Sequence, residues 1–464
     1  MDATLAWAIV ALLVVGCVAL ALVVSVTTGN CHASFAIPLL CQPSVGLPAA
    51  ILIAALPLLV FGTARHPLAT LFALYIVLVP IDDVLLVGSS LTVTKLLGIA
   101  VAVAAIATIV KRGIRIRLPF AVFGWGAVVG MMALSLAWSI DPTLSVETLV
   151  TIVSAFALFV IIVAVPMEPE EFRAVIAGTI ASGVVVGIIA MFSARHELST
   201  LSGQVGRLYL TFGGTTLDPN RFGASLLLSV AMTLGVIGQT RGWARIGLMA
   251  VLPFPLTAIY LTASRGTTLA LIAMAIVAII ASRYRLALSA ALAVVVGLML
   301  AIPNEITSRF FEEGTLASGA GRLYIWRVAI EVFRRHWLLG SGVGTFPSAY
   351  DRAFMLAFQP VSAGWTRAPH SLLISTATES GIVGIVVMIV ALILQYRSVR
   401  SIGPEHPYPW LRTVFRAAFV GLLVAATFVD VLGAKFSWLL FTEMLLAVGL
   451  AMHRPIVRPQ LKDR

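Results

Sequence analysis

The chain has 464 residues, of which 60% are hydrophobic and 11% are charged, and its mean hydropathy is +1.04. Soluble globular domains carry about 25% charged residues, so this composition excludes an ordinary soluble protein. The net charge of +11 would suggest nucleic-acid binding in a soluble chain. Here the placement of basic residues between apolar runs explains much of the charge, and no nucleic-acid partner is expected.

Apolar runs of roughly 17–25 residues recur along the chain, as expected of helices that span a bilayer. The first run lacks a basic start and a clear small-residue cleavage site, so we interpret it as a retained helix. We predict an all-α, polytopic integral membrane protein with about 12–14 transmembrane helices. The runs occupy residues 5–26, 47–62, 67–80, 92–110, 118–138, 146–166, 173–193, 222–239, 246–262, 266–282, 286–302, 371–395, 411–432 and 437–453.

The short connections between these runs differ in charge from one side to the other. Residues 27–46, 81–91 and 139–145 contain no Lys or Arg. Basic loops face the cytoplasm, so the sequence predicts cytoplasmic termini and an outward-facing segment 303–370. We divide the chain into a bundle at 1–302, this loop, and C-terminal helices with a tail at 371–464. The basic connections are Arg65, Lys111–Arg117, Arg241 with Arg245, Arg283 with Arg285, Arg397 with Arg400, and Arg454–Arg464.

Two cysteines, Cys31 and Cys41, lie in the outward connection 27–46. In an oxidising compartment cysteines at this spacing can form a local disulfide. The alternative is a pair of free thiols near the membrane surface. Neither interpretation assigns them to the chemistry.

Motifs of soluble enzymes and metal sites do not explain the chain. The segment Gly340–Gly344 resembles a phosphate loop in composition, but no strand–turn–helix pattern surrounds it, and a turn is favoured. No group of His, Cys, Asp and Glu has the spacing of metal ligands. We predict neither a metal nor another cofactor.

Two arginines lie at the predicted outer ends of apolar runs. Arg221 follows Asp218-Pro-Asn, a pattern typical of a turn and a helix start. Arg265 lies between Ser264 and Gly266. Arginine inside a bilayer is costly and usually has a partner or a function. The alternative is an interfacial arginine that reaches lipid headgroups.

The loop contains an amphipathic segment at residues 321–335. Its flanks are basic and aromatic, as in helices that lie in the membrane interface. In the functional interpretation Arg322 and Arg327 turn inward, where a guanidinium binds a diphosphate in bidentate fashion. In the alternative the helix is held only by anionic lipid. Its expected apolar face comprises Leu323, Trp326, Ile330 and Phe333.

His370 lies between Pro369 and the polar start of the next run. A lone histidine is more often structural than catalytic. Its position on the same face as the arginines favours a general base, because imidazole accepts a hydroxyl proton near neutral pH.

The segment His370-Ser371-x9-Gly381 resembles the signature of O-antigen ligases and related Wzy-type polymerases. Arg265-x3-Leu269 resembles a second element of that superfamily. Gly321–Trp326 and Leu338–Phe346 are similar to parts of its large periplasmic loop. The resemblance covers roughly residues 210–390, and the first 200 or so match only in hydropathy.

The resemblance implies a membrane glycosyltransferase with a GT-C-like architecture at the periplasmic face of the bacterial inner membrane. Its donor would be a glycan on polyprenyl (undecaprenyl) diphosphate, and its acceptor a sugar hydroxyl on a lipid or glycan. Arg265 and Arg322, joined by Arg221 and Arg327, would bind the donor diphosphate, and His370 would be the base. Arginines would take the place of a divalent metal, and transfer would invert the sugar.

Two other functions remain open. A Wzy-type polymerase would use the same chemistry to join lipid-linked repeat units. A transporter or flippase of lipid-linked sugars would bind the diphosphate without breaking it. Transporters usually contain an internal repeat and charges near the membrane midplane, which this sequence does not display.

The predicted sidedness can be tested with reporter fusions. Because the basic connections alternate, a reporter fused after Arg352 should behave as periplasmic and one fused after Arg400 as cytoplasmic. The measurement is alkaline phosphatase activity against green fluorescence in intact cells. Both reporters on the same side would remove the basis for grouping Arg221, Arg265 and His370.

Overall fold

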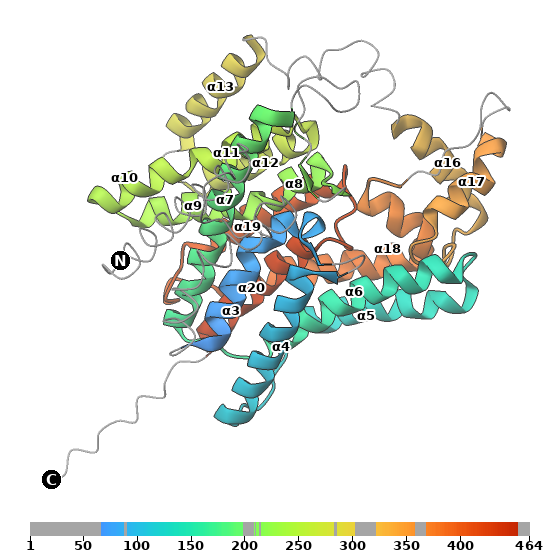
Figure 1. Cartoon of the computed structure of the whole chain (residues 1–464), viewed down its shortest axis with the longest axis horizontal. Coiled ribbons are helices and arrows are strands. Elements are labelled where there is room, and N and C mark those ends of the chain that lie inside the picture. Colours follow the sequence, from blue (N-terminus) through green and yellow to red (C-terminus); the bar gives the residue numbers. More distant parts are fainter. Residues whose placement is uncertain are drawn as a thin grey trace, which may run out of the picture.

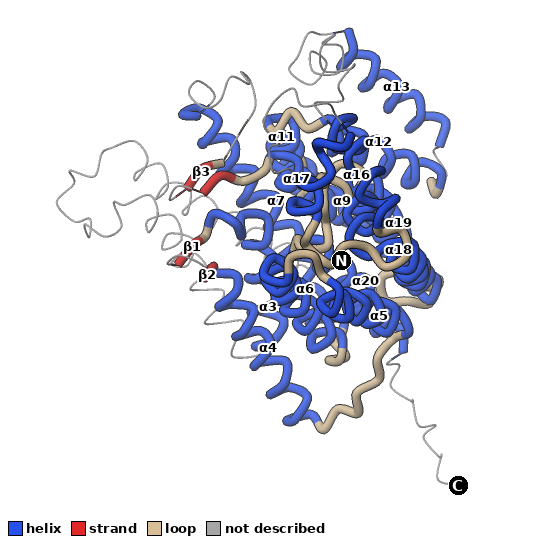
Figure 2. The backbone as a smooth tube through the Cα atoms, turned by 90° about the vertical axis from the view of Figure 1, so that its right-hand side faces the viewer, coloured by secondary structure: helices blue, strands red, loops and turns tan. Residues whose placement is uncertain are grey.

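A computed structural model describes residues 66–87, 91–197, 208, 210–212, 215–282, 285–301, 322–357 and 368–452. This part of the chain is mostly helical, as predicted, with two short strand pairs to one side of the helices (Figure 2). The predicted runs 5–26 and 47–62, and Cys31 with Cys41, lie outside the described residues.

The first described helices run from residue 67 to the middle of the chain (Figure 1). They are α3 (Pro67–Leu78), the 3-10 helix η2 (Val79–Val84), α4 (Val93–Arg112), α5 (Phe120–Leu134), η3 (Ser135–Trp138), α6 (Pro142–Val163) and α7 (Pro169–Glu197). The strands form two antiparallel pairs, β1 (Leu86–Val87) with β2 (Leu91–Thr92) and β3 (Thr211–Phe212) with β4 (Thr215–Thr216).

The second half continues with shorter helices and then with two of the proposed loop's helices. They are α8 (Pro219–Ser225), α9 (Leu227–Gln239), α10 (Gly242–Val251), α11 (Pro253–Leu261), α12 (Arg265–Ile280), α13 (Arg285–Ala301), α16 (Arg322–Arg335), α17 (Phe346–Ala357), α18 (Leu372–Ser398), η4 (Val399–Ser401), α19 (Leu411–Ala426) and α20 (Lys435–Met452).

Within the described residues, seven segments are long and apolar enough to cross a membrane, and Arg265–Ile280 is a shorter apolar helix. The chain is therefore a polytopic membrane protein, as the sequence indicated. The total of about 12–14 spans stays a prediction, because two of the predicted runs lie outside these residues.

Several predicted runs are divided or shortened in the structure. The run 246–262 becomes α10 and α11, because Pro253 has no N–H with which to continue the helical ladder. The run 222–239 begins earlier, at Pro219, because Asp218 caps the helix by accepting the N–H groups of Asn220 and Arg221. The run 411–432 is helical only to Ala426, so its last residues form a turn.

Small residues let the helices approach closely. Gly178 of α7 faces the backbone of Ala73 in α3, where an added Cβ would lie 2.9 Å from the Cα of Ala73. Such contacts are typical of helix packing in membranes, where van der Waals packing replaces the hydrophobic effect. Gly266 of α12 is packed in the same way against Phe428, which follows α19.

An aromatic cluster joins helices from both halves of the chain. The Trp125 ring of α5 stacks on Phe441 of α20, with centroids 4.5 Å apart, and meets Trp438 edge-on at 5.4 Å. The Trp125 indole N–H donates to the side-chain oxygen of Gln395 in α18 at 3.1 Å. Residues far apart in sequence therefore form one core, in which the indole N–H of Trp438 is also hydrogen-bonded, to the carbonyl of Leu432 at 2.8 Å.

Helix α18 is broken at the end of its first third. Gly381 has φ 65° and ψ −163°, which is outside the helical region. The backbone that follows α16 pairs with this break, because the N–H of Ile382 donates to the carbonyl of Trp337 at 2.8 Å. An added Cβ at Gly381 would lie 2.4 Å from the carbonyl carbon and oxygen of Leu338. Both the conformation and the close contact require glycine at this position.

Substitution of Gly381 should therefore destabilise the protein. Gly381→Ala should lower the free energy of unfolding by about 1–2 kcal/mol, because alanine is strained at the positive φ of this position. Displacement of Leu338 by the added Cβ should lower it further. The measurement is the apparent Tm of the purified protein in detergent. Gly403→Ala is the control, because no atom lies within 4 Å of its added Cβ. An equal Tm for the two variants would contradict this account of the break.

Candidate active site

The helices α16 and α17 pack together beside the turn between α5 and α6 and the start of α18 (Figure 1). The buried face of α16 comprises Ile325, Val328, Ala329 and Val332. Its partners on α17 include Phe346, Ala349 and Tyr350. The prediction of an amphipathic helix is confirmed, but the predicted apolar face is wrong, because Ile330 is 52% exposed.

The partner helix α17 explains which face of α16 is buried. A face made of Ile325, Val328 and Ala329 is flatter than one made of aromatic residues, and it permits close contact with α17. Trp326 is only partly buried at the edge of this contact. The helix therefore packs on protein through its small residues, and its larger side chains border the contact.

Helix α17 is attached to the turn before α6. The Ser348 hydroxyl donates to the Asp141 carboxylate at 2.7 Å, and the same carboxylate caps α6 through the N–H of Leu144. These hydrogen bonds lower the pKa of Asp141 below its ordinary value. The Arg352 guanidinium adds a contact to the carbonyl of Ile140 at 3.4 Å.

The glycine-rich segment Gly340–Gly344 is a structural turn. Gly340, Gly342 and Gly344 all have positive φ. The N–H of Ser341 donates to the carbonyl of Thr378 at 2.9 Å, and the N–H of Gly342 donates to the carbonyl of Glu379 at 3.0 Å. These amides are bonded to α18, so they do not form a cradle for phosphate.

A buried carboxylate secures the end of this turn. Glu379, which is 7% exposed, accepts the N–H groups of Gly344 at 2.9 Å and Phe346 at 3.2 Å. It therefore caps the start of α17 from within α18. The Glu379 carboxylate also accepts the hydroxyl of Ser375, one turn earlier on the same helix, at 3.4 Å.

Two short hydrogen-bonded connections bring Arg221 and Arg265 near each other. Asp218 fixes the first turn of α8, which contains Asn220 and Arg221. The Ser264 hydroxyl caps α12 through the N–H of Thr267 and donates to the side-chain oxygen of Asn220 at 2.9 Å. Arg265 is the next residue after Ser264, so the cap of α12 holds the starts of both helices together.

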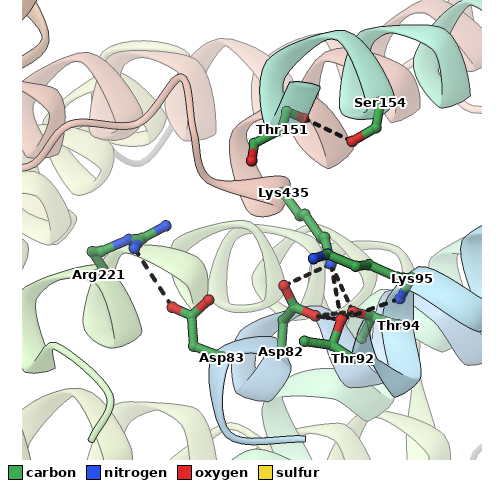
Figure 3. Close-up of polar contacts among 9 residues, drawn as sticks. All are labelled: Asp82, Asp83, Thr92, Thr94, Lys95, Thr151, Ser154, Arg221 and Lys435. Carbon is green, nitrogen blue, oxygen red and sulfur yellow. Dashed lines mark hydrogen bonds and ion pairs between the residues drawn. The ribbon is translucent and has the colours of Figure 1, made fainter. Parts of the chain in front are cut away.

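Arg221 forms an ion pair with Asp83 of η2, with a distance of 3.5 Å from Nη1 to Oδ2 (Figure 3). The two side chains are 38% and 47% exposed. A half-exposed pair of this length contributes no more than about 1 kcal/mol, so a stronger anion can replace Asp83.

The neighbouring carboxylate, Asp82, binds Lys435 at the start of α20 (Figure 3). The distance from Nζ to Oδ2 is 2.6 Å, and both side chains are less than 20% exposed, at 18% and 14%. The hydroxyls of Thr92 and Thr94 also donate to Asp82. This better buried pair connects the last helix to η2 and β2, and it holds Asp83 near Arg221.

Asp430, in the turn between α19 and α20, connects the arginine to the histidine. Burial raises the pKa of Asp430, while the positive charges of Arg221 and His370 act in the opposite direction. Both side chains are therefore close enough to act on this carboxylate. Its other partners are the N–H of Leu432 at 3.2 Å and the Ser375 hydroxyl at 3.1 Å.

His370 has a left-handed backbone, with φ 47°. Among the described residues it shares positive φ with one other non-glycine residue, Ala263, which has φ 45° and lies two positions before Arg265. Such backbone conformations are uncommon in non-glycine residues and cluster at functional sites. His370 is itself a residue that the sequence singled out, and Ala263 lies close to another, Arg265.

The other two predicted arginines, Arg322 and Arg327, both belong to α16. Arg327 is an exposed side chain of α16 and does not turn into the protein. Arg322 is the first residue of α16, and its side chain lies outside the described part. The positive charges of Arg221 and His370 both act on Asp430. Ser264, which precedes Arg265, donates to Asn220, which precedes Arg221. We call Asp82, Asp83, Arg221, Arg265, His370, Asp430 and Lys435 the charged cluster.

The sequence interpretation did not select four members of this cluster. Asp430 had a signal, because it is a lone carboxylate inside the predicted apolar run 411–432, where such residues are costly. Asp82 and Asp83 lie in the connection 81–91, which was predicted to face outward, and Lys435 begins the last described helix. No spacing in the sequence relates these residues to Arg221, because their contacts depend on how the helices pack.

The charged cluster can perform two chemical tasks. Arg221 and Arg265 provide fixed positive charge for an anion such as a diphosphate. His370 provides a proton acceptor, and a nearby carboxylate stabilises its imidazolium form. Among the described residues no group of three or more His, Cys, Asp and Glu is arranged to hold a metal ion.

Comparison with known protein families gives one match. Residues 248–389 match the family model described as O-antigen ligase (Wzy_C). The match confirms the resemblance found in the sequence, and it contains Arg265, Arg322 and His370. Arg221 and Asp430 lie outside the matched residues. A search of curated proteins found no match.

Proposed function

From the match of residues 248–389 to O-antigen ligase, we propose that this protein is a membrane glycosyltransferase. It transfers a glycan from a polyprenyl diphosphate donor to a sugar hydroxyl, at the periplasmic face of the inner membrane. The observation that supports this most is that Asp430 interacts electrostatically with both Arg221 and His370. Diphosphate binding and proton transfer would then take place near the same carboxylate.

In this proposal the donor diphosphate is held by Arg265 and Arg221. The diphosphate replaces Asp83 at Arg221, because the existing ion pair is half exposed and 3.5 Å long. Arg322 and Arg327, on α16, add positive charge from the loop. An arginine fork suits the planar, paired oxygens of a diphosphate better than an ammonium group does.

The reaction is a displacement at the anomeric carbon. His370 accepts the proton of the acceptor hydroxyl, whose oxygen forms the new glycosidic bond. The bond from the anomeric carbon to the diphosphate oxygen breaks, and the electron pair leaves with the diphosphate. Arg265 and Arg221 stabilise that developing charge, and attack from the opposite face inverts the configuration. Neither a metal nor another cofactor is required.

Asp430 acts on the same step through His370. When the imidazole takes the proton it becomes a cation, and a nearby carboxylate favours that form. Ser375 holds the Asp430 carboxylate at 3.1 Å and lies close to Glu379, which caps α17. The proposed loop helices are thus connected to the base through α18.

The proposed topology has about 12–14 spans, cytoplasmic termini, and the segment 303–370 outside. The acceptor decides between a ligase and a polymerase: a lipid-core sugar would indicate the ligase, and a second lipid-linked repeat unit the polymerase. The test is purified protein in lipid with a polyprenyl diphosphate glycan and each acceptor, followed by product mass. Release of donor across the membrane without any coupled product would indicate a transporter.

Substitutions should separate donor binding from chemistry. Arg265→Ala should weaken donor binding and slow transfer together, and Arg265→Lys should restore only part of both. His370→Ala should leave donor binding nearly intact and reduce turnover by about 10²–10⁴-fold. The measurements are donor affinity and single-turnover rate in the same membranes. Full turnover in a folded His370→Ala variant would show that His370 is not the base.

The role of Asp430 predicts a change in pH dependence. The wild-type rate should fall at acidic pH as the imidazole becomes protonated. In Asp430→Asn the carboxylate no longer favours the imidazolium, so the acidic limb of the profile should move to lower pH, with a lower maximum rate. The measurement is single-turnover rate against pH. An unmoved limb would restrict Asp430 to a structural role.

A further inference from the structure

An apolar groove lies between α18 and α19. It has a volume of about 150 Å³, and its walls include Leu372, Thr376, Ile385 and Met388 of α18, Ala426 at the end of α19, and Thr427, which follows α19. Apart from the two threonines, all of its side chains are aliphatic or methionine.

One end of the groove is next to the charged cluster. Leu372 lies two positions after His370, and Thr427 lies three positions before Asp430. On α18, Ser375 donates to Asp430 at 3.1 Å, while the next residue, Thr376, lines the groove. The groove therefore begins where the polar site ends and follows α18 away from it.

Thr376 supplies a second observation. It is 4% exposed, and its hydroxyl has no hydrogen-bond partner among the described residues. Buried hydroxyls usually have a partner, because burying one without a hydrogen bond costs free energy. An oxygen of a bound lipid near its headgroup would provide that partner.

We propose that this groove binds the isoprenoid chain of the donor, which rests on the function proposed above. A diphosphate held by Arg221 and Arg265 leaves its lipid chain to extend past His370 and into the space between α18 and α19. A single groove between two helices suits the one hydrocarbon chain of a polyprenyl diphosphate. A membrane phospholipid has two acyl chains and fits it less well. Met388 is unbranched and adaptable, so it can accommodate the methyl branches of isoprene units.

The lipid bilayer is itself apolar, so the groove gains nothing from the hydrophobic effect alone. Its selectivity for the donor must come from the fit between side chains and the chain. A bulky residue in the groove should therefore reduce binding of a long isoprenoid chain and leave binding of a short one unchanged.

The test compares two neighbouring positions on α18. Ile385 lines the groove, and Val386 is 55% exposed and does not line it. Ile385→Trp should lower the affinity for a long-chain polyprenyl diphosphate about tenfold, which corresponds to a loss of about 1.4 kcal/mol of van der Waals contact. It should leave geranyl diphosphate binding unchanged, and Val386→Trp should match the wild type with both.

The measurement is binding of the two sugar-free lipid diphosphates to protein in nanodiscs. Thr427→Trp changes an exposed residue on the opposite wall of the groove, and it repeats the test in case Ile385→Trp folds poorly. Equal losses for the long and short chains, or none in either groove variant, would overturn the proposal. Because binding is measured without transfer, an absent reaction would count against the proposed function and not against the groove.

Discussion

The break of α18 at Gly381 is the constraint on which the arrangement of the site depends. A continuous helix would keep its own hydrogen bonds and would offer none to another segment. Because the backbone turns at Gly381, Ile382 donates to Trp337, while the carbonyls of Thr378 and Glu379 accept from the turn after α16. One helix therefore carries His370 just before its start, and it anchors both α16 and α17 a few residues later.

This arrangement gives a structural reason for the spacing between His370 and Gly381. The histidine precedes the helix, and the glycine marks the point where the helix opens to accept the glycine-rich turn. Glu379, between them, caps α17 and contacts Ser375, which in turn holds Asp430. The distance along the chain reflects the separation between the start of α18 and the point on the same helix where the glycine-rich turn docks.

The sequence predicts the membrane class and several helix starts well, because hydropathy and capping act locally. Asp218 and Ser264 are caps in the structure, and Pro253 divides a predicted run. The predicted face of α16 is wrong because the pattern allowed two overlapping apolar faces, and only the neighbour α17 selects between them. The surroundings of Arg221 could not be predicted at all, since Asp83 lies in η2 and Asp430 lies in the turn between α19 and α20.

The ion pair of Lys435 with Asp82 has a consequence for how the protein is made. Asp82 leaves the ribosome early in synthesis, whereas Lys435 begins the last described helix. The hydroxyl of Thr94 that also binds Lys435 is 341 positions away in the chain. The electrostatic balance around Arg221 is therefore completed only when α20 has inserted. A nascent chain, or one truncated before α20, thus lacks part of the charged cluster, which is completed after most of the surrounding helices have been made.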